Sequence, residues 1–172
     1  MQSVVLPNQE ISANISYKNL TNPHYRIYKL NQNELDELDG ESKQDIVKTL
    51  LKKNYIVENE IELPTTTRQN SSKDDYNYEA IITNNFDFFL PSLECGIYFI
   101  MISKDDKFSK SEDNLPAIHA FQVSSLSFVT TKENNDFVVY VLDRDSGKPI
   151  KDVNVNIYKR TYDYKTREYV NT

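Results

Sequence analysis

Apolar and polar residues alternate along several short segments of this 172-residue chain, as they do in half-buried β-strands. The clearest are residues 11–17 and residues 24–30, and the second has large apolar side chains on both faces. Residues 97–102 are almost wholly apolar, which predicts a central strand covered on both sides. Further segments with strand character are residues 55–63, 76–82, 117–128, 137–142, 153–158 and 162–170.

One segment has the period of a helix. Ile46, Val47, Leu50 and Leu51 fall on one stripe of a helix, and Ser42 with Asp45 resembles a capping box before them. This pattern predicts a helix from about Lys43 to Lys53, inserted between strands, and a shorter turn at residues 34–39.

These elements predict an all-β fold, an immunoglobulin-like β-sandwich over residues 1–122 with one inserted helix. Residues 64–75 and 104–116 are polar enough to be loops. Residues 1–122 hold 12 basic and 19 acidic residues, a net charge of −7, whereas residues 123–172 hold 8 and 7, a net charge of +1. A sandwich needs about seven strands. Residues 123–172 supply three or four, so we expect an incomplete second β-sandwich there.

Composition excludes several classes of function. The net charge of −6 argues against a nucleic-acid binder and against an anionic membrane surface as partner. No apolar run is long enough to span a bilayer, and no signal peptide is visible. The three glycines cannot form a phosphate-binding loop. The 12 tyrosines and 8 phenylalanines suit a β-sheet; a sugar-stacking platform is the alternative, which the absence of tryptophan disfavours.

Few residues are candidates for catalysis. Cys95 could act as a nucleophile with His24 or His119 as its base, but no catalytic motif surrounds it. We therefore expect Cys95 to be a buried, inert thiol at the start of a central strand. The two histidines could share a metal ion with an aspartate, although ordinary strand histidines are the favoured interpretation. We assign no catalytic, cofactor-binding or metal-binding residue, and we expect no cofactor and no enzymatic activity.

Three groups of polar residues admit two interpretations each. Asp143, Asp145 and Gly147 hint at a calcium loop, but the spacing fits a hairpin turn better, with Asp143 bonded to its own backbone and Gly147 at positive φ. Paired carboxylates at residues 74–75 and 105–106 could suggest glycoside hydrolysis, although both pairs lie in polar loops. Glycosylation patterns begin at Asn14, Asn19 and Asn70 and matter only for a secreted eukaryotic protein.

Several segments resemble the macroglobulin-like domains of bacterial α2-macroglobulin-family proteins. The strongest match is Val138 to Val155, in which an Asp-x-x-Ser-Gly-x-Pro turn separates two alternating strands. Residues 6–19 resemble the opening strands of such a domain, and residues 90–98 its Leu-Pro and Gly-x-Tyr pattern. Residues 121–128 are similar to the strand that closes one domain and opens the next. The resemblance implies a macroglobulin-like domain at 1–122 and the first part of another at 123–172.

The resemblance also implies a function. Cys95 and Gly96 are followed by Ile97 and Tyr98, so the family's reactive Cys-Gly-Glu-Gln thioester cannot form there. We therefore expect a non-catalytic structural module of an exported bacterial α2-macroglobulin-like protease inhibitor. Its location would be periplasmic, outer-membrane-associated or extracellular. Its partners would be the other domains of the parent chain and, through the full-length protein, proteases. The alternative is a ligand- or carbohydrate-binding β-sandwich of a bacterial surface uptake system.

Overall fold

The computed structural model describes residues 3–18, 20–64, 83–108, 115–134, 136–157, 160–163 and 168–171. Strands far outnumber helices among the described residues, so the protein is mostly β, as the alternating pattern predicts. The contacts divide the chain into two compact units, Met1–Ser125 and Leu126–Thr172, which are described separately.

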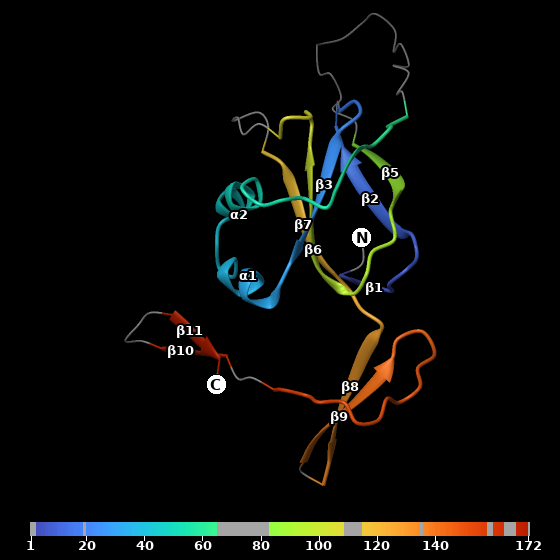
Figure 1. The fold of residues 1–172 in the computed structure, drawn as a ribbon, viewed down its shortest axis with the longest axis vertical. Coiled ribbons are helices and arrows are strands. Elements are labelled where there is room, and N and C mark those ends of the chain that lie inside the picture. Colours follow the sequence, from blue (N-terminus) through green and yellow to red (C-terminus); the bar gives the residue numbers. More distant parts are fainter. Residues whose placement is uncertain are drawn as a thin grey trace, which may run out of the picture. The chain divides into compact units, whose positions relative to one another are not determined.

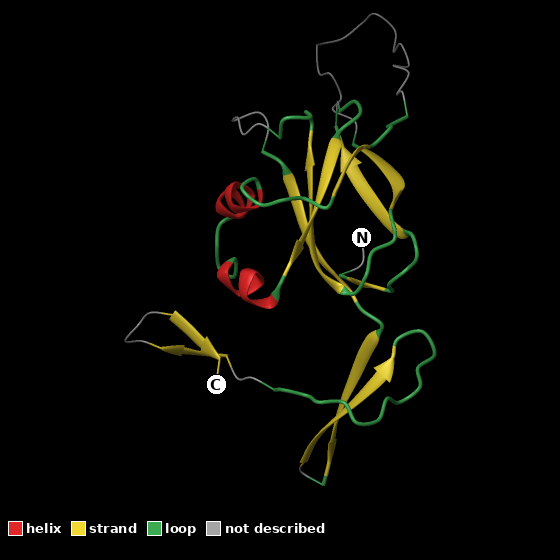
Figure 2. Ribbon diagram, viewed as in Figure 1, coloured by secondary structure: helices red, strands yellow, loops and turns green. Residues whose placement is uncertain are grey.

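A five-stranded sheet forms the centre of the first unit (Figures 1 and 2). β1 pairs with β7 in parallel, and every other neighbouring pair is antiparallel. In spatial order, the strands are β1 (Val4–Val5), β7 (Ala117–Val123), β6 (Gly96–Ser103), β3 (His24–Leu30) and β4 (Val57–Glu60). The apolar segment 97–102 therefore lies in the middle strand, β6, which confirms its prediction as a central strand.

A second, two-stranded sheet covers one face of this central sheet (Figure 1). β2 (Ile11–Tyr17) pairs with β5 (Asn84–Leu90) in antiparallel register from Ile11↔Leu90 to Tyr17↔Asn84. Alternate side chains of both strands point inward and meet those of β3, β6 and β7 in the first core. Its buried residues are Ile11, Ala13, Tyr25, Ile27, Ile61, Leu90, Leu93, Tyr98, Ile100, Phe121 and Val123.

Two short helices cover the opposite face and close a second core (Figure 2). They are α1 (Gln32–Glu37) and α2 (Lys43–Leu50), and α2 buries Val47 and Leu50 completely. The buried residues of this core are Tyr28, Leu30, Leu38, Val47, Leu50, Phe99, Met101 and Phe108. The first unit is thus a β-sandwich with helices as a third layer, and β3 has buried side chains on both faces, as predicted.

The helix prediction holds with two corrections. Ser42 caps α2 by accepting a hydrogen bond from the Asp45 amide, but the helix ends at Leu50 rather than Lys53. The segment expected to be a turn is α1, which begins with a full capping box between Asn31 and Glu34. Each of these two residues accepts a hydrogen bond from the backbone N–H of the other, which satisfies two amides at the helix start.

The described residues of the second unit form two antiparallel strand pairs. β8 (Leu126–Glu133) pairs with β9 (Asp136–Asp143), and β10 (Arg160–Asp163) pairs with β11 (Glu168–Asn171). No residue of this unit whose burial is described is buried. This contrasts with the two closed cores of the first unit.

Three strand predictions between residues 117 and 170 are wrong. Residues 117–128 are not one continuous strand, because Ser124 and Ser125 separate β7 from β8. Within the predicted strand 162–170, residues 162–163 lie in β10 and residues 168–170 in β11, two strands that pair with each other. Residues 153–157 are not a strand, since the chain bends at Lys151–Asp152, where Asp152 has a φ of 58°, and leaves its brief pairing with β9.

Other predictions fall outside the described residues. They are the strand at residues 76–82, most of the loop at 64–75, the carboxylate pair Asp74–Asp75, and the glycosylation positions Asn19 and Asn70.

Candidate functional site

Cys95 lies in the segment that leads into β6, and its side chain is exposed. The prediction that it is buried is wrong, because the inward position in this segment is taken by Leu93 and the strand begins only at Gly96. Lys29 from β3 approaches the same segment, with its Nζ 3.7 Å from Glu94 Oε2. The Tyr98 hydroxyl donates a 2.9 Å hydrogen bond to the Glu94 carbonyl oxygen. These contacts order the backbone around Cys95.

The two histidines lie on opposite faces of the central sheet. His24 is in phase with Tyr28 and Leu30, which face the second core, and His119 is in phase with Phe121, which faces the first. The sheet therefore separates the two imidazoles, and they cannot bind one metal ion. Among the described residues, no group of three or more His, Cys, Asp or Glu side chains is placed to hold a metal.

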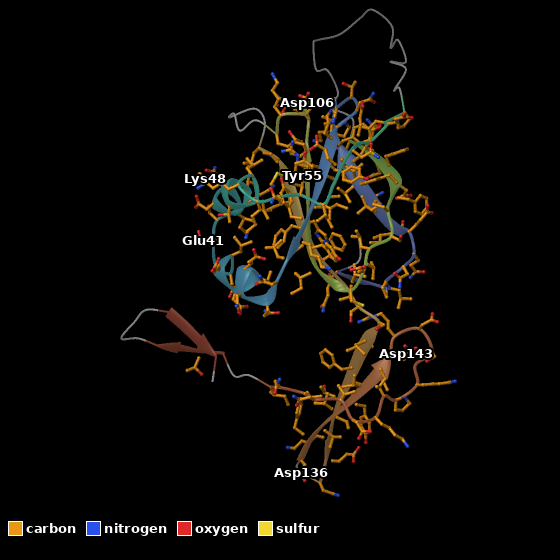
Figure 3. All side chains as sticks on the ribbon, in the orientation of Figure 1. Glu41, Lys48, Tyr55, Asp106, Asp136 and Asp143 are labelled. Carbon is orange, nitrogen blue, oxygen red and sulfur yellow. The ribbon has the colours of Figure 1, made fainter. Side chains whose placement is uncertain are left out.

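The turn after β9 has the geometry of the hairpin interpretation (Figure 3). One oxygen of Asp143, Oδ1, accepts hydrogen bonds from the Ser146 amide at 2.8 Å and the Ser146 hydroxyl at 2.6 Å. Gly147 has a φ of 66°, and its amide donates to the Asp143 carbonyl oxygen. The hydrogen bonds from Ser146 lower the pKa of Asp143. The Asp143 carboxylate thus stabilises its own turn, which confirms the turn prediction.

The Asp105–Asp106 pair lies in the turn that follows β6. Asp106 is exposed, whereas Asp105 is half-buried and its amide donates to Ser103 Oγ (Figure 3). The Asp105 carbonyl oxygen accepts from the Phe108 amide at 3.4 Å. This turn directs the Phe108 side chain into the second core, where it is 1% exposed.

A cluster of polar and aromatic side chains surrounds Arg26 on β3. Its guanidinium carbon lies 4.1 Å from the Phe108 ring centroid and 4.6 Å from that of Tyr55. Its Nε donates a 2.7 Å hydrogen bond to Glu58 Oε2 on β4. Tyr28 packs edge-on against Tyr55 in the same cluster. One cation therefore joins β3 to β4, to the loop after β6 and to the segment before β4, whose Tyr55 is labelled in Figure 3.

The ionisation of this cluster follows from its contacts. The hydrogen bond from Arg26 lowers the pKa of Glu58. Desolvation works against the charge on Arg26, but the hydrogen bond and charge of Glu58 outweigh it and raise the Arg26 pKa. Desolvation also raises the pKa of Tyr28. Arg26 and Glu58 are therefore both charged at neutral pH. Each has the other as its hydrogen-bond partner, so the pair can hold β3 and β4 together.

Sequence reasoning missed the Arg26 cluster, although a signal was present. Arg26 is in phase with Tyr28 and Leu30 along β3, so a charged side chain had to face the second core. A charge in such a position needs a partner. The partner Glu58 lies directly opposite in the β3–β4 register.

The outer face of the β2–β5 sheet carries a row of exposed polar side chains. Asn14 Nδ2 donates a 2.7 Å hydrogen bond to Asp87 Oδ1, and the Ser16 hydroxyl donates to Asn85 Oδ1. Phe89 stands on the same face and is 65% exposed. This face combines one aromatic ring with hydroxyl, amide and carboxylate groups.

No helix among the described residues is long and apolar enough to cross a membrane. Comparison with protein-family models, with curated proteins and with solved structures found no match to this chain.

Proposed function

We propose that this chain is a non-catalytic structural module of an exported bacterial protein that resembles the α2-macroglobulin protease inhibitors. In this proposal the first unit is a rigid spacer, and the second unit is part of a domain-to-domain contact. The observation that carries the proposal is the β8–β9 hairpin, which is apolar on both faces and buries none of its described residues.

The pairing register assigns the apolar side chains of the hairpin to its two faces. One face carries Leu126, Phe128, Phe137, Val139 and Val141, and the other carries Val129, Val138, Tyr140 and Leu142. Phe128 is 70% exposed and Phe137 is 65% exposed. A two-stranded ribbon is at best marginally stable alone and needs cover on its apolar faces. Further strands of a parent chain would supply that cover, as in a series of β-sandwich domains.

The polar clusters of the first unit support a structural role. The Arg26–Glu58 pair joins β3 to β4. Glu34 caps α1 and also accepts a hydrogen bond from the Lys53 ammonium group, which follows α2 in the chain. Each of these side chains is held by a partner within the fold. A scaffold needs such ties, because they fix the geometry that it transmits to its neighbours.

The test compares this chain with the full-length parent protein against broad-specificity proteases. The scaffold proposal predicts that the parent slows the proteases and that this chain alone does not. In the parent, the double variant Phe128→Ser/Phe137→Ser should weaken inhibition, because it removes apolar contact from the second unit. Phe89→Ser is the matched control: its ring is as exposed as that of Phe137 but lies in the first unit. Inhibition by this chain alone, or equal loss in the control, would contradict the proposal.

The outer face of the β2–β5 sheet favours a second candidate function, the binding of a carbohydrate. Phe89 could stack on a sugar ring while Asn14 and Asp87 bond its hydroxyl groups. Titration calorimetry with neutral oligosaccharides tests this candidate. Stoichiometric binding that Phe89→Ala abolishes would favour it over the scaffold, and the absence of heat with a broad oligosaccharide panel would remove it.

A further inference from the structure

The two edges of the central sheet are protected to different extents. β4 forms one edge and carries Glu58 and Glu60, and charged residues of this kind discourage pairing with other strands. At the other edge, β1 pairs with β7 only at Gln122 and Val123. Residues 117–121 of β7 consequently have no strand on that side within the part of the chain that the structure describes.

The backbone groups of this open edge point away from the sheet. The amides of Gln122 and Ser124 donate outward, to the carbonyl oxygens of Ser3 and Val5 at 2.8 and 2.9 Å. Since N–H and C=O groups alternate in direction along a strand, those of Ile118 and Ala120 point to the same outer side. They provide two donors and two acceptors that no described segment pairs with.

The side chains around this edge leave it accessible. Ala117, His119 and Ala120 are exposed, and they lie on both faces of β7. Residues 117–121 contain no proline, no glycine and no Asp, Glu, Lys or Arg. An edge of this composition lacks the features by which proteins prevent strand addition.

We propose that the edge of β7 at Ile118 and Ala120 is a strand-addition site, which takes an extended peptide segment of another polypeptide. β1 already pairs on this edge from a distant part of the chain, so the added segment would continue an existing pairing. Its main chain would form four hydrogen bonds, with the N–H and C=O groups of Ile118 and Ala120. This inference does not depend on the proposed scaffold function.

A second copy of β7 does not fit this edge. Ser3 lies opposite the Phe121–Gln122 step and limits how far an added strand can extend. In antiparallel pairing that uses Ile118 and Ala120 of both copies, Ala117 of the copy falls opposite Phe121 and meets Ser3. Shifting the register by two residues sets Pro116, which has no N–H, opposite Ala120. A short free segment can end before Ser3, whereas β7 continues into these residues.

Charge and packing define the segment. The chain has a net charge of −6, which favours a neutral or basic peptide over an acidic one. Ile118 is half-buried against the second core, so an apolar side chain beside it would extend that core. The expected ligand is therefore an extended, neutral-to-basic segment with apolar residues at alternate positions.

Residue-resolved amide hydrogen exchange of the intact chain tests the proposal. In the free chain, the amides of Ile118 and Ala120 should exchange far faster than those of His119 and Phe121, which point toward β6. Protection of Ile118 and Ala120 in the free chain would overturn the proposal, because the edge would then be covered. Protection that increases with protein concentration would also overturn it, in favour of a second copy.

The second step adds a probe peptide, acetyl-Lys-Val-Thr-Val-Thr-Lys-amide. At a peptide concentration about ten times its Kd, the two amides should exchange about tenfold more slowly. Alternate amides of a bound peptide strand point toward β7 and away from it. N-methylation of the set that points toward β7 should abolish the slowing of exchange, and N-methylation of the other set should preserve it. No slowing at any peptide concentration up to millimolar, or equal effects of both methylation patterns, would refute the site.

A matched pair of variants completes the test. Ala120→Pro removes an N–H that points away from β6, so the pairing of β6 with β7 should survive. The expected loss is the protection that the peptide gives to the Ile118 amide. Ala120→Val keeps the N–H and should keep the response. If Ala120→Pro does not fold, the methylated peptides still decide the question with the unmodified chain.

Discussion

Arg26 and Glu58 lie directly opposite each other on β3 and β4, and their side chains are joined by a 2.7 Å hydrogen bond from Nε to Oε2. The Phe108 and Tyr55 rings contact the same guanidinium, so the pair holds a buried phenylalanine of a distant loop as well as two strands. Phe108 has a φ of 53°, which is strained for a bulky side chain. The contact with Arg26 helps to offset that strain.

Replacement of Arg26 should destabilise the first unit. Arg26→Lys keeps the charge but loses the planar contact with both rings and the Nε donor, and we expect a loss of about 1–2 kcal/mol in unfolding free energy. Arg26→Gln should cost more, about 2–4 kcal/mol, because it leaves Glu58 without a charged partner. Chemical denaturation of both variants checks this order, and equal stability of Arg26→Gln and the original chain would contradict the role of the pair.

The lowered pKa of Glu58 predicts a dependence of stability on pH. A carboxyl group whose pKa is lower in the folded state stabilises the fold above its unfolded pKa, near the ordinary value of 4.5. This contribution is lost as the pH falls through the folded pKa. Glu34, whose pKa the hydrogen bond from Lys53 lowers, acts in the same direction. Stability should therefore be level from pH 7 to about pH 5 and fall below that.

Denaturation midpoints measured between pH 7 and pH 3 test this dependence. Glu58→Gln should reduce stability at pH 7 and flatten the acid limb of the curve. Glu62→Gln is a suitable control, because it removes an exposed carboxylate from the segment just after β4. An acid limb of unchanged steepness in Glu58→Gln would argue against the assignment.

A β-carbon at position 96 should not fit without movement. It would lie 2.9 Å from Lys29 Cε and 3.2 Å from two ring carbons of Tyr98. The end of Lys29 can move aside, but Tyr98 is 1% exposed and hydrogen-bonded to Glu94, so it cannot. Gly96→Ala should lower the free energy of unfolding by about 1–3 kcal/mol. Thermal melts check this, and in the Lys29→Ala background most of the loss should remain, since the ring causes it.

The exposed thiol of Cys95 should react with a thiol reagent in the native state. Because Leu93 occupies the inward position, labelling should need no denaturant and should proceed at a rate close to that of the unfolded chain. The rate of labelling is measured near neutral pH from the absorbance of the aromatic thiolate that a disulfide reagent releases. Cys95→Ser gives the background rate. Labelling that requires denaturant would restore the buried interpretation.

The parts of the fold that the sequence predicts well are those with a strict period. β2 and β3 follow from alternation and β6 from its continuous apolar run, because their side chains meet apolar cores. α2 follows from the apolar stripe that runs from Ile46 to Leu51. The predictions fail where tertiary pairing decides. Residues 153–157 alternate between apolar and polar side chains but pair with no strand. Cys95 precedes Gly96, at which β6 begins. The Arg26 cluster depends on Phe108 and Tyr55 arriving from separate segments, which no local pattern encodes.

The first unit has two closed cores, whereas no residue of the second unit whose burial is described is buried, so we expect the second unit to need cover from elsewhere. Native-state hydrogen exchange across the whole chain tests this most directly. We predict that the slowest amides lie in β3 and β6, at positions such as Ile27 and Met101, and exchange only by global unfolding of the first unit. Amides in β8 and β9 should exchange by openings that cost far less free energy, even those paired between the two strands. Equal protection of β6 and β9 would contradict the account, because the second unit would then have a core of its own.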